Sequence, residues 1–331
     1  MIARGPTHAR TAAAYLAASR RARASLAILG TIALVAVFAD VIASAAPLLR
    51  WGDRVELFPG LVGEDGRGSD HEPSSAVFAP VRADPTALGP EVLAPPQRGH
   101  ALGTDERGRD VLARLVHGAR IALGTSVLAI ALSLVLGLAF GALAGSGSTR
   151  WNRRLARFVE AVDTFPAIVA VALIRAIETE PSAWSMAAGV ALVKWAEIAR
   201  VVRAEVLRLS LEDFVLASRA LGASRFRTLF YHVLPHTVGP VAVCAALGVG
   251  SVTLLESAVT FLGLGPASDH PSWGELLAQA ARHPDRPWLL AAPTLAIGLT
   301  VGAAFLLADA LRDATDPRAV RLREAPGRRP T

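Results

Sequence analysis

The chain has 331 residues, of which 52% are hydrophobic and 19% are charged. Its apolar residues gather in runs of about 20, the length that crosses a bilayer, so the pattern excludes an ordinary soluble domain. The formal charge of +6 is divided among short segments beside these runs, which indicates membrane topology rather than a nucleic-acid-binding surface. The single cysteine, Cys244, excludes a disulfide framework.

We predict an all-α membrane protein with six transmembrane helices. The predicted spans are 25–46, 121–145, 158–177, 184–202, 239–262 and 288–308. The first run has an alternative as a signal peptide, because Ala43, Ser44 and Ala45 resemble a cleavage site. We favour an uncleaved span, since the run is longer than the roughly 7–15 apolar residues of a signal-peptide core.

The charges between the spans predict the orientation. The N-tail, 1–24, and the segment 146–157 carry arginines and no acid, whereas 47–118 carries more acids than arginines. Basic loops stay in the cytoplasm. We therefore place the N-tail and the C-tail, 312–331, in the cytoplasm, and the loop 47–120 outside.

The outer loop is expected to have two parts. Residues 47–102 are rich in proline, glycine and charge without a sustained period, which predicts an irregular loop. From Gly103 the sequence reads GTDERGRDVLARLVHGARIAL, in which Val111, Leu115 and Val116 share one helical face and Asp110 is placed to cap it. We predict a short amphipathic helix at the outer membrane surface, before the second span.

The five spans from 121 to 311 form the predicted membrane core. Gly137, Gly141 and Gly145 recur every four residues in the second span, a spacing that lets a neighbouring helix approach its backbone closely. This pattern predicts a helical bundle.

A polar loop, 204–237, separates the fourth and fifth spans. Ser210 is placed to cap a first short helix, Gly222 to end it in a left-handed conformation, and Ser224 to cap a second helix that stops at Pro235. The apolar spacing predicts that Phe214, Ala217, Ser218 and Leu221 share one face, and that Phe226, Leu229, Phe230 and Val233 share another. Spacing leaves two interpretations open: a helix pair resting on lipid headgroups, or a rigid knob that docks into a cytosolic partner.

Several motifs resemble one known family. They are GTDERGRDVLARLVHGARIAL (103–123), RALGASRFRTLFYHVLPH (219–236), TFLGLG (260–265), PSWGELL (271–277) and LADALRDATDPR (307–318). In this order they resemble the permease subunits of dipeptide, oligopeptide or nickel ABC importers. The loop 204–237 is similar to the coupling loop of such permeases, with Leu216-Ala217-Ser218 in place of their Glu-Ala-Ala triplet.

The resemblance implies an ABC importer permease fold in a bacterial inner membrane. It implies a second related permease subunit, two cytosolic ATPase subunits and a periplasmic solute-binding protein as partners. It assigns docking on the ATPases to residues of the coupling loop, namely Ala217, Ser218, Arg219, Gly222, Ala223, Arg225, Phe226, Phe230, Leu234 and Pro235.

The chain itself is expected to bind no cofactor and to catalyse no reaction. A nucleotide-binding P-loop needs a lysine after a glycine loop, whereas Lys194, the only lysine, precedes Trp195 and follows no such loop. ATP is therefore expected to be used by the partner subunits. Peptides are the expected cargo, and nickel or another small solute is the alternative on the same architecture.

Two acidic residues inside the predicted spans are candidates for a transport pathway or for interior hydrogen bonding: Asp163 and Glu256. A metal site is not expected, because Pro235 separates His232 from His236 and no third ligand is evident. An ATP-independent carrier or channel is a weaker alternative, and the absence of a G-x-S-x-G motif argues against an intramembrane hydrolase.

Overall fold

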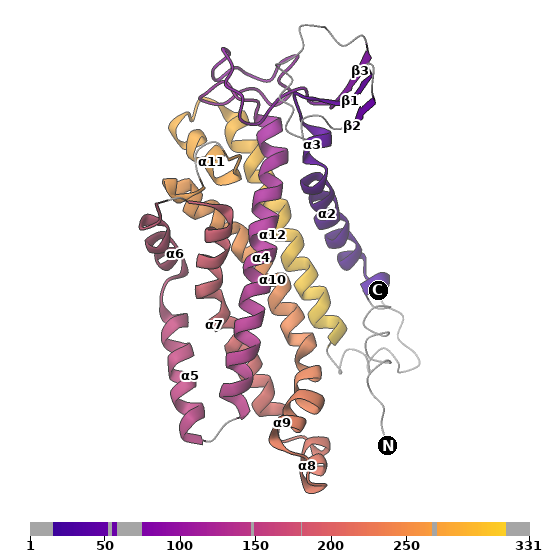
Figure 1. The fold of residues 1–331 in the computed structure, drawn as a ribbon, viewed down its shortest axis with the longest axis vertical. Helices are drawn as coiled ribbons and strands as arrows, with labels where there is room; N and C mark the ends of the chain where they lie inside the picture. The colour runs from indigo at the N-terminus through magenta and orange to yellow at the C-terminus, as the bar shows by residue number, and fades with distance from the viewer. Residues whose placement is uncertain are drawn as a thin grey trace.

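The computed structural model of the chain describes residues 16–51, 55–57, 75–146, 149–179, 181–266 and 270–315. Most of this part is helical, and the long helices run side by side along the length of the molecule (Figure 1). The helices are α2 (Arg20–Val37), α3 (Ala39–Ile42), α4 (Val111–Ser146), α5 (Thr149–Thr164), α6 (Ala167–Ala176), α7 (Ala183–Leu209), α8 (Asp213–Ala220), α9 (Arg225–Arg227), the π-helix η2 (Thr228–Val233), the 3-10 helix η3 (Leu234–Thr237), α10 (Val238–Val259), the π-helix η4 (Thr260–Leu264), α11 (Trp273–Arg282) and α12 (Pro287–Thr315).

Three helical stretches of the described chain are long and apolar enough to cross a bilayer. They are Val111–Ser146, Arg225–Leu264 and Pro287–Thr315. A bilayer core of about 30 Å needs roughly 20 residues at 1.5 Å per residue, and each stretch exceeds that length. They contain the predicted second, fifth and sixth spans.

The third predicted span, 158–177, is not one helix. Helix α5 ends at Thr164 and α6 begins at Ala167, with Phe165 and Pro166 between them. Proline has no backbone N–H and disfavours helical geometry in the residue before it, which explains the break. The ten residues of α6 are apolar apart from Arg175, and they rise only about 15 Å.

The predicted short helix at the outer surface is wrong as a separate element. Helix α4 runs without interruption from Val111 to Ser146, so the amphipathic turns are the outer end of a transmembrane helix. The predicted cap is confirmed, because the backbone N–H of Ala113 donates to Asp110 Oδ1 at 2.7 Å. Nothing between residues 117 and 123 interrupts the helical hydrogen bonds, so the polar and apolar parts fold as one element.

The prediction that 47–102 is wholly irregular is also wrong. Strand β1 (Pro47–Trp51) pairs antiparallel with both β2 (Val55–Leu57) and β3 (Ser75–Phe78), in the order β2-β1-β3. Each strand is only three to five residues long, too short for a period of two to stand out in the sequence. The sheet projects from the upper end of the bundle (Figure 1).

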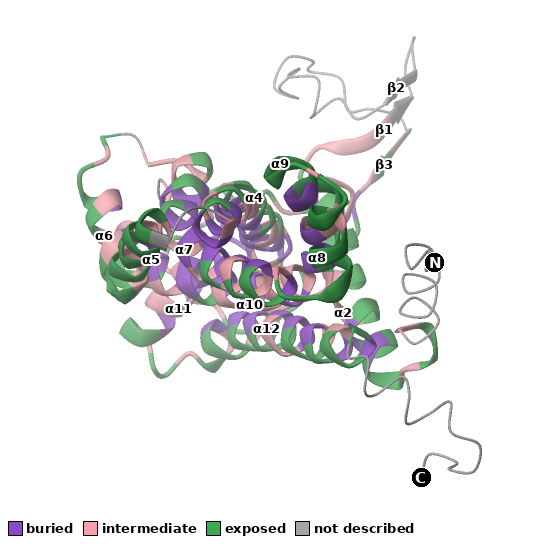
Figure 2. Cartoon of the chain, turned by 90° about the horizontal axis from the view of Figure 1, so that it is seen from below, coloured by how far each residue is buried: buried purple, intermediate pink, exposed green. Residues whose placement is uncertain are grey.

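Buried side chains gather where α4, α7 and α10 meet, as Figure 2 shows in purple. The predicted glycine stripe of α4 is confirmed as the contact with α7. A Cβ added at Gly137 would lie 2.6 Å from Ile198 Cγ2, and one at Gly141 would lie 2.6 Å from the Ala199 carbonyl oxygen. Glycine therefore sets the distance between the two helices.

Gly141→Val is expected to destabilise the bundle by about 1–3 kcal/mol, because the added methyl groups would overlap the backbone of α7. Gly124→Val is the matched control in the same helix, since a Cβ there meets nothing within 4 Å. Thermal unfolding of the two purified variants in one detergent measures the difference. Equal melting temperatures for both variants would contradict this role of Gly141.

Candidate functional site

The coupling loop forms the lower tip of the molecule, at the end opposite the sheet (Figure 1). Helix α7 extends to Leu209, seven residues beyond the predicted span. The prediction that Ser210 caps the next helix is wrong. Its Oγ–H donates to the Val206 carbonyl at 2.6 Å, at the end of α7. Helix α8 then begins at Asp213, whose carboxylate lies in the first turn.

The turn after α8 is a tightly bonded glycine cap. Gly222 has φ +85°, which confirms the predicted left-handed conformation. The N–H of Gly222 donates to the Arg219 carbonyl at 3.0 Å, and the N–H of Ala223 donates to the Ser218 carbonyl at 3.1 Å. These two bonds define a Schellman motif, which holds the exit of α8 in one geometry.

The second helix starts as predicted but does not stop at Pro235. Ser224 Oγ accepts the N–H of Arg227 at 3.3 Å, which confirms the cap. Helical structure then continues through η2 and η3 into α10, so Arg225–Leu264 is one stretch. Pro235 lies in the first turn of the 3-10 helix, where its missing N–H is tolerated.

Three buried side chains anchor the coupling loop to the bundle. Val215, Leu229 and Val233 pack into one cluster with Val202 and Val206 of α7. The predicted faces are therefore only partly right, because Phe214 and Leu221 are exposed while their neighbour Val215 is buried. Only one residue of the short α8 reaches the core, and helical spacing does not determine which residue that is.

Much of the remaining surface of the coupling loop is apolar and exposed. Leu221 is 89% exposed, Tyr231 76% and Phe226 71%, and the rings of Phe226 and Phe230 stack with centroids 5.4 Å apart. Arg219, Arg225 and Arg227 are exposed beside them. The predicted docking residues lie in α8, the turn after it, α9, η2 and η3: Ala217, Ser218, Arg219, Gly222, Ala223, Arg225, Phe226, Phe230, Leu234 and Pro235. An apolar patch rimmed by cations at the end of a helix pair is suited to binding another protein.

The two acidic candidates lie apart from this tip and have different partners. Asp163 forms an ion pair with Arg200 of α7 at 2.5 Å. Glu256 is 1% exposed and accepts hydrogen bonds from Thr260 Oγ1 at 3.2 Å and Ser272 Oγ at 3.3 Å. Glu256 thus links α10 to the cap of α11.

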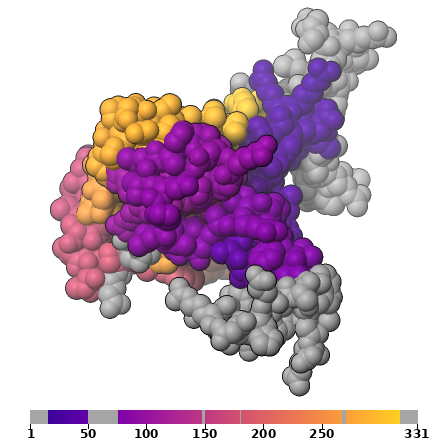
Figure 3. Space-filling model, turned by 90° about the horizontal axis from the view of Figure 1, so that it is seen from above, coloured from indigo at the N-terminus to yellow at the C-terminus, as the bar shows by residue number. Residues whose placement is uncertain are grey.

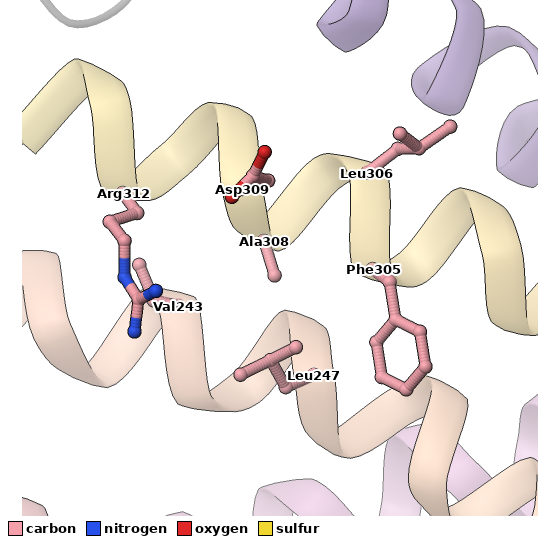
Figure 4. Close-up of a pocket in the computed structure, with 7 residues that line it drawn as sticks. All are labelled: Val243, Leu247, Phe305, Leu306, Ala308, Asp309 and Arg312. Carbon is pink, nitrogen blue, oxygen red and sulfur yellow. The ribbon is translucent and has the colours of Figure 1, made fainter.

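A pocket lies between α10 and α12, and neither Asp163 nor Glu256 lines it. Its volume is about 340 Å³. Figure 4 shows Phe305 pointing from α12 toward α10 and Arg312 lying beside Val243. Its walls are largely apolar, with Asp309 and Arg312 as the charged lining residues.

At the end of the bundle opposite the coupling loop, the structure contains a buried ion-pair network that sequence reasoning missed. Arg109 Nε lies 2.7 Å from Asp105 Oδ2, and Arg109 Nη2 lies 2.9 Å from Glu275 Oε1. Arg114 also pairs with Glu275, and it donates Nη1–H to the Pro85 carbonyl at 2.9 Å. The three partners Asp105, Arg109 and Arg114 are at most 1% exposed at their side chains. The network joins α11 to the loop before α4, and Figure 3 shows that segment lying over the upper end of the bundle.

Close glycine contacts hold the same loop. Gly103 and Gly108 both have φ +73°, and a Cβ on Gly108 would overlap the carbonyl of Gly89. The hint in the sequence was GTDERGRD, in which acids and arginines stand close together around Gly108. Glu275, the partner of the arginines in this region, lies more than 160 residues away in the sequence, so no local pattern identified the ion pairs.

The comparisons with known proteins agree with this architecture. The family model of the binding-protein-dependent transport system inner membrane component matches residues 137–321. The chain belongs to this family. It is therefore the membrane permease component of a multi-subunit transport system, and a multi-pass membrane protein.

Curated relatives of this permease cover most of its length. The dipeptide transport system permease protein DppC of Alkalihalophilus pseudofirmus is 33% identical over 247 residues, covering 73% of this chain and 81% of the relative. The di/tripeptide transport system permease protein DppC of Pseudomonas aeruginosa is 37% identical over 253 residues, covering 73% and 83%. The oligopeptide transport system permease protein OppC of Haemophilus influenzae is 33% identical over 243 residues, covering 73% and 78%.

The family match of the permease includes the coupling loop and Glu275 but begins after Asp105, Arg109 and Arg114. The buried network therefore ties the family-matched core to the segment that precedes it. A second, more exposed ion pair also joins α11 to the segment before α4. Arg282 of α11 donates two hydrogen bonds of 2.8 Å to the Glu106 carboxylate.

Stability of the permease is expected to depend on the charge of Glu106. Hydrogen bonds from Arg282 hold the pKa of the Glu106 carboxyl below its ordinary value of 4.5. A lowered folded-state pKa stabilises the fold above the unfolded pKa, and this contribution is lost as the pH falls through the folded-state value. Glu106→Gln should therefore lower the melting temperature at neutral pH but have no effect at a pH well below 4.5. A melting-temperature difference between variant and wild type that stays constant with pH would exclude this linkage.

Proposed function

We propose that this protein is the peptide-translocating permease subunit of an ABC importer in a bacterial inner membrane. The proposal includes six crossings with both termini and the coupling loop in the cytoplasm. It is supported by the family, by relatives named for dipeptide, di/tripeptide and oligopeptide transport, and by an exposed helix pair at one end of the bundle. We choose peptides as the cargo because permeases named for peptide transport align with about three-quarters of the chain.

In this proposal the energy comes from other chains. Two cytosolic ATPase subunits use ATP, a second related permease completes the pathway, and a periplasmic solute-binding protein delivers the peptide. This chain binds no cofactor, in keeping with a sequence that lacks a P-loop.

The contacts of the coupling loop suit it to transmit movement. Its glycine cap makes the turn after α8 stiff, and Val215, Leu229 and Val233 fasten it to the bundle. Because helical structure runs from Arg225 to Leu264, a push on α9 reaches α10 without passing through a flexible link. Closure of the ATPases would thus tilt the membrane helices between inward-facing and outward-facing states.

Docking of the ATPases on the coupling loop is tested by Phe226→Asp in the assembled transporter. A carboxylate at a 71% exposed ring position should leave the fold intact and weaken the apolar contact with the ATPase. We expect at least a tenfold loss of ATPase subunits retained on the tagged permease, and a parallel loss of dipeptide uptake into proteoliposomes.

Leu88→Asp is the matched control, because Leu88 is 73% exposed at the opposite end of the molecule. It should retain the ATPases fully. Full retention and uptake by the Phe226 variant would contradict docking at this tip. Uptake without any ATPase subunit would point to a carrier instead.

A further inference from the structure

Helix α5 carries four arginines on one face. Arg150, Arg153, Arg154 and Arg157 fall within a sector of about 100°, since each residue advances the helix by that angle. The buried residues of α5, Ala156 and Val159, lie on the opposite face, where the helix packs against α7 and α4. The arginine face therefore points away from the bundle, and Figure 2 shows α5 exposed at its rim.

Three of the four arginines, namely Arg150, Arg154 and Arg157, have no carboxylate partner within the described part of the chain. Arg150, Arg154 and Arg157 are exposed and form no ion pair there. The segment 149–157 contains no acidic residue. The two acids later in α5 are Glu160, which is exposed and forms no ion pair among the described residues, and Asp163, which pairs with Arg200. This face therefore concentrates positive charge, which favours the binding of an anionic partner.

The side chains around the stripe indicate where it sits. Trp151 and Phe158 are 54% and 51% exposed and lie together on the flank of α5 beside the arginines, where the Phe158 ring also contacts Trp195 of α7 with the ring centroids 6.0 Å apart. Further along the chain the exposed side chains become apolar, with Phe165, Val169 and Leu173 at the surface. A change along the chain from arginine to exposed phenylalanine and aliphatic side chains is the profile of a segment passing from lipid headgroups into hydrocarbon.

We propose that the arginine stripe of α5 is a binding site for anionic phospholipid, with the guanidinium groups on the lipid phosphate. The stripe rises about 10 Å along the helix, comparable with the 5–8 Å depth of the headgroup layer. Arginine suits this partner because its planar group binds phosphate oxygens bidentately. The leaflet is the one on the side of the coupling loop, since the lower end of α5 lies toward that tip (Figure 1).

The test titrates the purified permease, with its partner subunits, with phosphatidylglycerol or phosphatidylcholine and counts bound lipids by native mass spectrometry. Each arginine near a charged lipid surface contributes roughly a fivefold preference, so R154Q/R157Q should bind phosphatidylglycerol at least tenfold more weakly and phosphatidylcholine unchanged. R154K/R157K should recover most of the binding, because the charge is kept. The preference of the wild type should shrink in high salt.

R82Q/R98Q is the control, since it removes two exposed arginines from the outer loop. It should bind both lipids as the wild type does. Equal phosphatidylglycerol binding by R154Q/R157Q and wild type would overturn the proposal, as would a loss of bound ATPase subunits with unchanged lipid binding, which would make the stripe a protein contact. Either result would leave peptide import itself untouched.

Discussion

Gly222→Val is expected to reduce peptide transport by at least tenfold while the ATPase subunits continue to hydrolyse ATP. Gly222 has φ +85°, a conformation that costs other residues about 1–2 kcal/mol and β-branched residues more. A Cβ at this position meets nothing within 4 Å, so the effect is purely one of backbone conformation. The turn would rearrange and lose the hydrogen bond from Ala223 to Ser218, which changes the angle between α8 and α9. Peptide uptake and ATP hydrolysis, measured on the same proteoliposomes, separate coupling from catalysis.

Gly222→Asn is the control for this experiment. Asparagine accepts the left-handed conformation at a helix C-terminus, so this variant should keep at least half of the transport activity. If valine and asparagine behave alike, the conformation of Gly222 is not what the coupling loop requires.

Glu275→Ala is expected to have the largest effect on stability, a loss of about 3–5 kcal/mol. Glu275 pairs with both Arg109 and Arg114, whose side chains are 1% and 0% exposed. Removing the carboxylate leaves two guanidinium groups short of a partner in a site that water reaches poorly. The melting temperature of the purified permease should fall by several degrees, and α11 should exchange its amide hydrogens faster.

Asp285→Ala provides the comparison for Glu275→Ala. Asp285 also pairs with an arginine on the outer side, Arg286 at 3.0 Å, but it is 66% exposed. Exposed pairs contribute about 0–1 kcal/mol, so this variant should melt close to the wild type. If both variants lowered the melting temperature by a similar amount, burial would not be the reason that the Glu275 network stabilises the fold.

The coupling loop and the Glu275 network are connected through the helical stretch Arg225–Leu264 and α11. The coupling loop leads into Arg225–Leu264 at one end, and Glu256 near the other end accepts a hydrogen bond from Ser272, the cap of α11. Helix α11 is held in turn by Glu275 to the outer loop. These contacts join the coupling loop to the opposite end of the bundle without a break.

The sequence alone was sufficient for features that depend on local chemistry. Apolar runs of bilayer length predicted the long helices, because backbone groups in lipid must bond within their own segment. The spacing of Gly137, Gly141 and Gly145 predicted a close helix contact, and Gly222 and Ser224 predicted the turn of the coupling loop. Each of these depends on residues a few positions apart.

Only the tertiary structure decided the features that join distant residues. Helical spacing could not say that Val215, rather than Phe214 or Leu221, packs on α7, or that α4 continues through its polar outer turns. The short strands between 47 and 78 are paired by backbone hydrogen bonds that leave little trace in side-chain pattern. Glu275 meets Arg109 and Arg114 only because α11 folds back over the loop before α4, and the energy of a buried charge pair depends on that approach rather than on either segment alone.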